Sequence, residues 1–262
     1  MRYLIIDNNL DRVQFYEREG VDTIFVDLER LGKQERQEHV DSVKSEHTIA
    51  DVRAVRQVIS KAELLVRIDP MNENSAQQIE DVIEAGADII MLPYFFTTKE
   101  VKDFIDYVGA RVKTCLLLET AAAVVRLPSI LQLKGIDRVH IGLNDLALSL
   151  KLNFMFEILT TKYIDHIIEQ LVLKGIPYGI GGVAPVYEGL IPGEMVLMEY
   201  YRLGASSTIL SRPFSKKAMK SLDEFNVAYA NLKNVEKMIQ KSSTDEMLEN
   251  KRGIAEIIKN HF

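Results

Sequence analysis

Two carboxylates stand at the ends of two apolar runs. Glu119 directly follows Cys115–Leu118, and Asp145 follows Ile141–Asn144. If both runs are neighbouring buried strands, their ends lie only about 5 Å apart at the same edge of a sheet. Like charges that close either share a proton or hold a cation. Because Mg²⁺ and Mn²⁺ prefer oxygen ligands, we predict that Glu119 and Asp145 bind one of these ions.

The turn before Asp145 offers further binding groups. Gly142 and the residues Leu143, Asn144 and Asp145 lead into a short predicted helix. The free backbone N–H groups of such a turn can hold a substrate carboxylate, so we place these four residues in a substrate-binding site. A purely structural role for Asp145, as the cap of the turn that starts at Leu146, is the alternative.

A cation ends another apolar run. Arg67 follows Leu64–Val66, and its guanidinium group can bind a carboxylate or stabilise an enolate oxygen. The preceding strand ends in Asp27 and then Glu29, so a salt bridge from Arg67 to either acid is a second role compatible with the first. After the next-to-last predicted strand, the glycines of Gly179–Gly182 permit close approach of a ligand.

The histidines do not suggest zinc. No two of them have the HxH or HxxxH spacing of zinc ligands. The five are His39, His47, His140, His166 and His261.

The elements that must position these side chains are short and repeated. Eight apolar runs read as strands that are buried on both faces. They are Tyr3–Ile6, Thr23–Asp27, Leu64–Ile68, Asp88–Leu92, Lys113–Leu118, Arg138–Ile141, Pro177–Ile180 and Ser207–Leu210.

Helical patterns separate the strands, and most end at a glycine followed by an apolar residue and the next strand. They are Leu10–Glu19, Thr48–Ser60, Ser75–Ala85, Thr98–Tyr107, Thr120–Leu133, Lys162–Lys174, Glu194–Leu203 and Phe214–Gln240. Eight such units favour a single (β/α)8 TIM barrel, an α/β fold whose active sites lie after the strands. A dinucleotide-binding sheet needs a glycine-rich first turn, which Ile6–Leu10 lacks.

The chain continues beyond the eighth unit. Polar, cap-like residues at 241–246 introduce a last helix from Thr244 through Ile258. We therefore divide the chain into a barrel, residues 1–240, and a C-terminal helical extension, residues 241–262. The strongly charged stretch Lys33–Lys44 is either a solvated surface or part of an active-site rim, because it follows the second strand.

Composition excludes several classes. The net charge of -6 argues against a general nucleic-acid binder, which needs a basic face. No stretch approaches the length of a membrane span, and the N-terminus is unlike a signal peptide. The single cysteine, Cys115, cannot form an internal disulfide, so we expect a cytoplasmic protein in which this thiol is a small buried apolar group.

Five strand-end motifs together resemble one family. Val26-Asp-Leu-Glu29, Val66-Arg67, Met91-Leu-Pro93, Leu118-Glu-Thr120 and Ile141-Gly-Leu-Asn-Asp-Leu146 are similar to motifs of the HpcH/HpaI aldolase and citrate lyase β-subunit family, over roughly residues 20–213. The resemblance implies a metal-dependent carbon–carbon lyase or aldolase of the phosphoenolpyruvate/pyruvate-binding barrels. It also implies a homo-oligomer.

The resemblance also assigns roles. Glu119 and Asp145 would hold Mg²⁺ or a similar ion, which would chelate pyruvate, oxaloacetate or a related 2-oxo acid. Arg67 would stabilise the enolate oxygen. Family aldolases often carry an acid–base histidine soon after the strand-two motif, where this chain has Arg30. We therefore name Glu29 and His47 as candidate catalytic groups, with His47 alternatively a surface residue beside a helix cap at Thr48.

A second departure concerns the substrate and activity. The citrate lyase branch usually has Pro-Lys after strand four, and here Tyr94 follows Pro93. This favours a small free acid or aldehyde over an acyl-CoA, with the second half of the substrate bound by Lys33–Lys44, Tyr94–Phe96 and Val183–Gly193. The alternative is a catalytically weak barrel that binds a keto acid or a protein partner.

Overall fold

The apolar runs form parallel strands that close into a barrel. The computed structural model describes residues 1–32 and 46–262, and its eight strands pair in chain order, with the last strand bonded to the first. The strands are β1 (Arg2–Ile6), β2 (Thr23–Asp27), β3 (Glu63–Arg67), β4 (Ile89–Leu92), β5 (Lys113–Leu118), β6 (Arg138–Ile141), β7 (Tyr178–Val183) and β8 (Ser207–Leu210). The predicted (β/α)8 barrel is confirmed, and charged Lys33–Lys44 lies outside the described residues.

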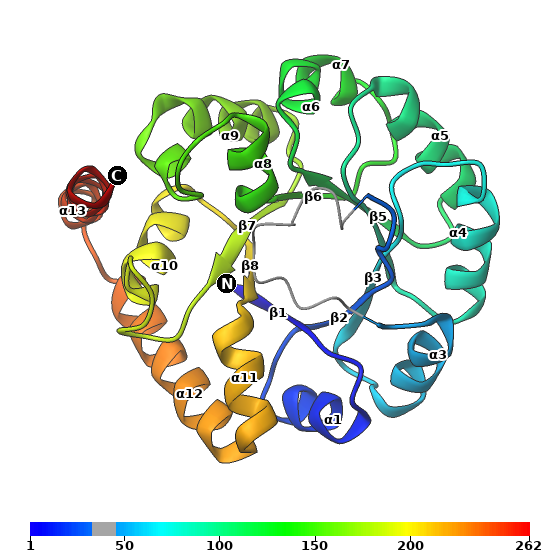
Figure 1. Cartoon of the computed structure of the whole chain (residues 1–262), viewed down its shortest axis with the longest axis horizontal. Helices are drawn as coiled ribbons and strands as arrows, with labels where there is room; N and C mark the ends of the chain where they lie inside the picture. The colour runs from blue at the N-terminus through cyan, green and yellow to red at the C-terminus, as the bar shows by residue number, and fades with distance from the viewer. Residues whose placement is uncertain (33–45) are drawn as a thin grey trace.

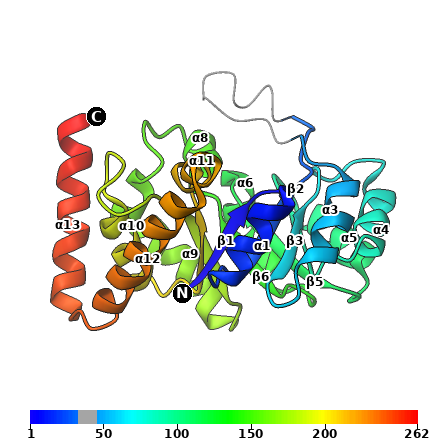
Figure 2. The ribbon, with the colours of Figure 1, turned by 90° about the horizontal axis from the view of Figure 1, so that it is seen from below.

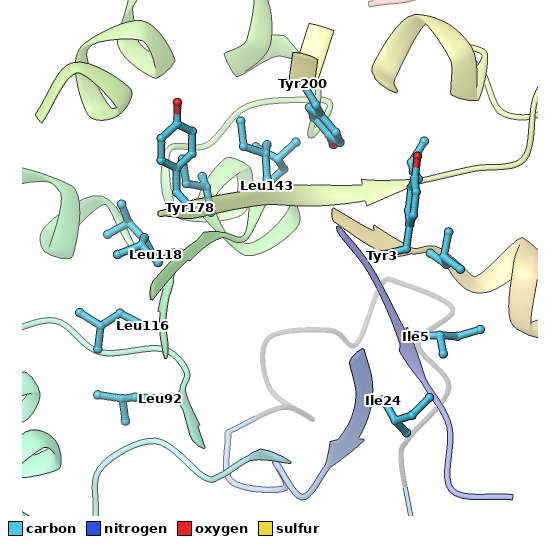
Figure 3. Close-up of a cluster of buried hydrophobic side chains, with 14 of the residues drawn as sticks. Tyr3, Ile5, Ile24, Leu92, Leu116, Leu118, Leu143, Tyr178 and Tyr200 are labelled. Carbon is cyan, nitrogen blue, oxygen red and sulfur yellow. The ribbon is translucent and has the colours of Figure 1, made fainter. Parts of the chain in front are cut away.

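Successive side chains of β1 to β5 alternate between two hydrophobic cores. One core fills the barrel and contains Leu4, Phe25, Leu65, Ile89, Met91, Cys115 and Leu117. The other lies between strands and helices. Figure 3 shows part of it, with Ile5, Ile24 and Leu116 pointing away from the barrel axis. Cys115 is buried inside the barrel, as expected for a small apolar group.

Helices surround the strands on all sides (Figure 1). They are α1 (Leu10–Arg18), α3 (Ile49–Val58), α4 (Ser75–Glu84), α5 (Thr98–Val108), α6 (Ala121–Val125), α7 (Leu127–Ile130), α8 (Leu143–Ser149), the 3₁₀ helix η1 (Glu157–Thr160), α9 (Lys162–Leu173), α10 (Gly193–Arg202), α11 (Arg212–Lys220), α12 (Leu222–Ile239) and α13 (Thr244–His261). Within the described residues, none is long and apolar enough to span a membrane.

Two predicted helices are each divided in two. The expected helix Thr120–Leu133 breaks at Arg126, because Pro128 lacks the N–H that a continuous helix needs and enters the first turn of α7. The expected helix Phe214–Gln240 breaks at Ser221, whose extended backbone and side chain cap the start of α12. Both corrections change the outer layer and leave the strand ends in place.

The last helix packs beside the barrel. Figure 2 shows α13 standing next to α10, outside the ring of helices. Ser243 caps its start in a reciprocal hydrogen-bonding arrangement with Glu246, as the cap-like sequence predicts. Ile254 is buried, and the side-chain amide of Asn250 donates to the carbonyl of Met195 on α10 at 2.9 Å.

Candidate active site

Arg67 is held rigidly at the barrel mouth. The pairing of β2 with β3 puts Asp27 opposite Arg67, and both side chains point inward. Arg67 donates two hydrogen bonds to the Asp27 carboxylate, from Nε at 2.9 Å and from Nη2 at 2.8 Å. Its Nε lies 3.3 Å from Glu29 Oε2, and its guanidinium lies over the ring of Phe25, 5.5 Å from the centroid. The predicted salt bridges therefore form to both acids.

One nitrogen of Arg67 is left for a ligand. All the hydrogen bonds that Arg67 makes to residues 1–32 and 46–262 come from Nε and Nη2. Nη1 therefore keeps its two N–H groups for a molecule that enters the barrel mouth. A guanidinium that is already oriented by two acids stabilises developing negative charge without having to reorganise.

Glu119 is buried directly after β5. Its side chain is 3% exposed, and its Oε1 accepts a hydrogen bond from the backbone N–H of Tyr94 at 3.0 Å. Tyr94 has a φ of 44°, a left-handed conformation that is strained for a residue with a side chain. Gly142 packs against the carboxylate so closely that a Cβ there would lie 2.8 Å from Glu119 Oε2. The glycine is therefore required by the space that Glu119 occupies.

Glu119 and Asp145 are electrostatic neighbours. Burial raises the pKa of Glu119 to about 8, and the negative charge of Asp145 adds to the effect, against an opposing contribution from Arg67. Among the described side chains, Asp27, Glu29 and Glu119 interact electrostatically with the guanidinium of Arg67, and Asp145 interacts with Glu119. The buried oxygens of Glu119 and the partly buried oxygens of Asp145 are donors of the kind that a hard divalent cation prefers.

Asp145 lies in the first turn of α8, and Gly142 is the N-cap residue of that helix. Leu146 donates its backbone N–H to the carbonyl of Gly142 at 3.1 Å, which closes the first helical turn. In the first turn of a helix, backbone N–H groups such as those of Leu143 and Asn144 find no carbonyl partner within the same helix. The substrate-binding role of Gly142 and the first three residues of α8 stays a prediction.

His47 lies beside the carboxylate cluster. Its Nδ1 accepts the backbone N–H of Asp27 at 3.1 Å, and its ring is half-buried. Its carbonyl accepts a hydrogen bond from the Arg30 side chain, and Thr48, the next residue, caps α3. Because Nδ1 accepts a hydrogen bond, the proton of the neutral ring is on Nε2. Its catalytic role stays a prediction.

Three details of the site were not predicted, although the sequence indicated Asp27 as a salt-bridge partner of Arg67 and Tyr94 as part of the substrate pocket. Asp27 was noted as a strand-end acid, but its bond to Arg67 depends on the β2–β3 register. Tyr94 gives no sequence signal for its left-handed backbone. His140 is buried, and burial lowers its pKa to about 4, so it is neutral at physiological pH. The absence of zinc-like spacing gave no reason to consider it.

Two surface hollows differ in their relation to this cluster. One of about 440 Å³ is lined by His47, Asp69 and Gln78 beside the barrel mouth. A larger one of about 620 Å³ is lined by Glu63 and Lys113 at the opposite, N-terminal end. Barrel enzymes place their chemistry at the carboxyl ends of the strands, so we do not assign the larger hollow to the active site.

Solved structures share this fold at low sequence identity. An HpcH/HpaI aldolase from Desulfitobacterium hafniense DCB-2 is 16% identical with a TM-score of 0.63, over 85% of this chain and 93% of that chain. An HpcH/HpaI aldolase/citrate lyase family protein from Burkholderia cenocepacia J2315 is 16% identical with a TM-score of 0.64, over 84% and 91%. Citrate synthase SbnG is 15% identical with a TM-score of 0.63, over 89% and 94%.

The sequence itself matches a family. No curated protein sequence gives a significant match. The family model described as HpcH/HpaI aldolase/citrate lyase matches residues 8–180, which include all five strand-end motifs and more than half of the 262 residues. The chain therefore belongs to the HpcH/HpaI aldolase/citrate lyase family, whose members are lyases and aldolases.

Proposed function

We propose that this protein is a divalent-metal-dependent carbon–carbon lyase or aldolase that acts on a 2-oxo acid through a pyruvate- or oxaloacetate-type enolate. The observation that carries the proposal is the cluster of buried Glu119 with the partly buried Asp145 and Arg67 at the barrel mouth. It combines oxygen donors for a cation with a fixed donor for an enolate oxygen. Family membership supports the same class of reaction.

Glu119 and Asp145 would hold Mg²⁺ or Mn²⁺. When bound, such an ion supplies Lewis-acid polarisation to the 2-oxo and carboxylate oxygens of the substrate. The chain's own groups complete the site. The first-turn N–H groups at Leu143–Asp145 would hold the substrate carboxylate, and Arg67 Nη1 would donate to the oxygen that becomes the enolate oxygen.

The reaction needs two proton transfers. In a 4-hydroxy-2-oxo acid the C3–C4 bond breaks, its electron pair enters the C2–C3 enolate, and the 4-hydroxyl loses its proton as the aldehyde leaves. The enolate carbon then gains a proton to give the 2-oxo acid. Glu29, which is 4% exposed, and His47 are the groups we propose for these transfers. Both follow β2: Glu29 Oε2 lies 3.3 Å from Arg67 Nε, and His47 Nδ1 accepts the backbone N–H of Asp27.

Metal binding is tested first. Protein stripped with EDTA should show a higher melting temperature with Mn²⁺ or Mg²⁺, and a further rise with oxalate, which resembles the enolate. Glu119→Gln should abolish both increases. The enzyme should also exchange the methyl protons of pyruvate into D2O faster than Mn²⁺ alone. No response to metal in the wild-type protein would refute the proposal.

A second candidate is a catalytically weak barrel that binds a keto acid. It is favoured by Arg30, which occupies the position after Glu29 and donates to the His47 carbonyl. The same experiments separate the two functions. Stabilisation by metal and oxalate without proton exchange above the metal blank would support the binding protein, whereas exchange supports the lyase.

We also propose that the protein assembles as a homo-oligomer, as family membership suggests. Sedimentation velocity tests this directly. A single species at the mass of one 29.8 kDa chain over a wide concentration range would contradict it.

A further inference from the structure

His140 is a buried histidine that the proposed reaction does not use. It lies on β6 opposite Leu117 of β5 and Gly179 of β7, and Leu117 belongs to the core inside the barrel. The ring is 3% exposed. Its Nε2 lies 3.0 Å from the carbonyl oxygen of Gly181. A carbonyl only accepts, so Nε2 carries the proton and donates it in this bond.

The carbonyl that His140 holds belongs to an irregular part of β7. The pairing of β7 with β8 shifts register between Gly179 and Gly182, and Gly181 has a φ of 41°. Such a bulge redirects a strand and leaves a residue outside the regular ladder. Two other side chains bind carbonyls of the bulge. Tyr200 donates to Gly182 at 3.1 Å, and Thr208 donates to Ile180 at 3.0 Å and lies 3.5 Å from the carbonyl of Gly181.

The bulge supports the helix that carries Asp145. A Cβ on Gly181 would lie 2.8 Å from Leu143 Cδ1 and 3.0 Å from Leu143 Cγ, so this backbone and that side chain are already in close contact. Leu143 is the first residue of α8 and is 2% exposed, and Asp145 follows two residues later. Movement of Gly181 therefore displaces the start of α8.

We infer that His140 is a positioning residue for Asp145: its Nε2–H fixes the Gly181 carbonyl, the β7 bulge supports Leu143, and Leu143 sets where α8 holds the Asp145 carboxylate. The inference rests on the proposed metal site at Glu119 and Asp145. Residues that orient a metal ligand without binding the metal themselves typically contribute about 10–100-fold to metal affinity.

Three variants test the role. His140→Phe keeps a flat ring and removes the donor. His140→Gln places an amide nitrogen near the position of Nε2 and restores a donor. Tyr178→Phe is the matched control, because it removes another buried bond from β7 to a carbonyl, that of Leu203 at 2.6 Å, on the outer side of the same strand.

Binding of Mn²⁺ is measured from the electron paramagnetic resonance signal of the free ion, alongside the melting temperature without metal. We expect His140→Phe to weaken binding by on the order of tenfold. His140→Gln and Tyr178→Phe should stay within about threefold of wild type. A purely structural role would lower the melting temperature of His140→Phe and of Tyr178→Phe alike while leaving both affinities unchanged.

If His140→Phe does not fold, Tyr200→Phe tests the same bulge from outside, because it removes only the hydroxyl that holds Gly182. It should also weaken Mn²⁺ binding several-fold. Wild-type affinity in both His140→Phe and Tyr200→Phe, or in Tyr200→Phe alone if the other is unfolded, would overturn this inference and leave the proposed function standing. A wild-type protein that binds no Mn²⁺ would overturn both.

Discussion

The Arg67 side chain has two compatible roles: it binds Asp27, and it can donate to a ligand at the barrel mouth. Its fork is bound to Asp27, and its third nitrogen is available at the barrel mouth. The side chain is only 14% exposed, so its charge acts in a site with little water to screen it. A lysine at this position would keep the charge but lose the planar fork that matches a carboxylate.

We therefore predict that Arg67→Lys lowers the rate of metal-dependent pyruvate proton exchange by on the order of 10²-fold, because an oriented donor to the enolate is lost. Mn²⁺ affinity should change little. Arg138→Lys is the matched control, since Arg138 also donates two hydrogen bonds to one carboxylate, that of Glu63, at the opposite end of the barrel. Equal exchange rates in the two variants would contradict the role of Arg67.

In the metal-free protein, the buried Glu119 carboxylate should lower the free energy of unfolding. Its pKa is raised from an ordinary value of 4.5 to about 8, mainly by burial and then by Asp145. Between these two pH values the folded state binds more protons than the unfolded state, so stability falls as the pH rises. Glu119→Gln removes this penalty.

In EDTA at pH 8, we expect Glu119→Gln to be more stable than wild type by roughly 1–4 kcal/mol, with most of the difference gone at pH 5. Urea unfolding at both pH values measures it. Addition of Mn²⁺ should not increase the stability of this variant. If the variant were less stable than wild type at pH 8, interactions within the metal-free protein would outweigh the cost of burying the charged Glu119 carboxylate.

At the scale of elements, one of the two missed helix breaks has a local signal in the sequence and the other has none. Pro128 marks the break between α6 and α7 in the sequence itself, since proline interrupts a helix wherever it occurs in the interior. Ser221 gives no such signal, because a serine inside a helix and a serine that caps one look alike until the chain direction changes. β7 extends three residues beyond its predicted end at Ile180, since its glycines form a bulge instead of a loop.

The C-terminal helix provides a prediction at this scale. Ile254 of α13 is 1% exposed where the helix packs beside α10, whereas Leu248 of the same helix is 39% exposed. Ile254→Ala should lower the free energy of unfolding by about 2–4 kcal/mol, because it removes buried methyl groups. Leu248→Ala should lower it by less than about 1 kcal/mol. Similar losses in urea unfolding would mean that α13 does not pack through this face.

Across the whole molecule, the two ends of the barrel use charge differently. At the N-terminal end, Glu63 of β3 accepts hydrogen bonds from Arg2, Lys113 and Arg138, which come from β1, β5 and β6. Burial opposes its ionisation, but the bonds from Arg138 and Lys113 and the nearby charges outweigh it and lower the pKa of Glu63 to about 2. At the N-terminal end, three cations therefore bind one acid, Glu63. At the active-site end, three acids within the described residues act on the guanidinium of Arg67.

The free energy of unfolding should therefore decrease as the solution becomes acidic enough to protonate Glu63. Because the folded pKa of Glu63 is below its ordinary value of 4.5, its contribution is fully present above pH 4.5 and is lost as the pH falls toward 2. Glu63→Gln should be less stable than wild type at pH 7 by on the order of 1–3 kcal/mol, and the difference should shrink at pH 3. Urea unfolding at both pH values checks this. If the stability difference between Glu63→Gln and wild type were the same at both pH values, packing of the side chain and not its charge would cause it.

The sequence by itself determined the barrel and the acids and cation at its mouth. Strands buried on both faces are apolar throughout, so Glu119 and Arg67 stand out where such runs end. The salt bridge of Arg67 was expected, but its two-bond geometry on Asp27, the strained amide of Tyr94 on Glu119 and the bond from His140 to Gly181 came only from the tertiary structure. Each joins strands or loops distant in the chain, and the register and closure that bring them together result from packing the whole barrel, which no local pattern encodes.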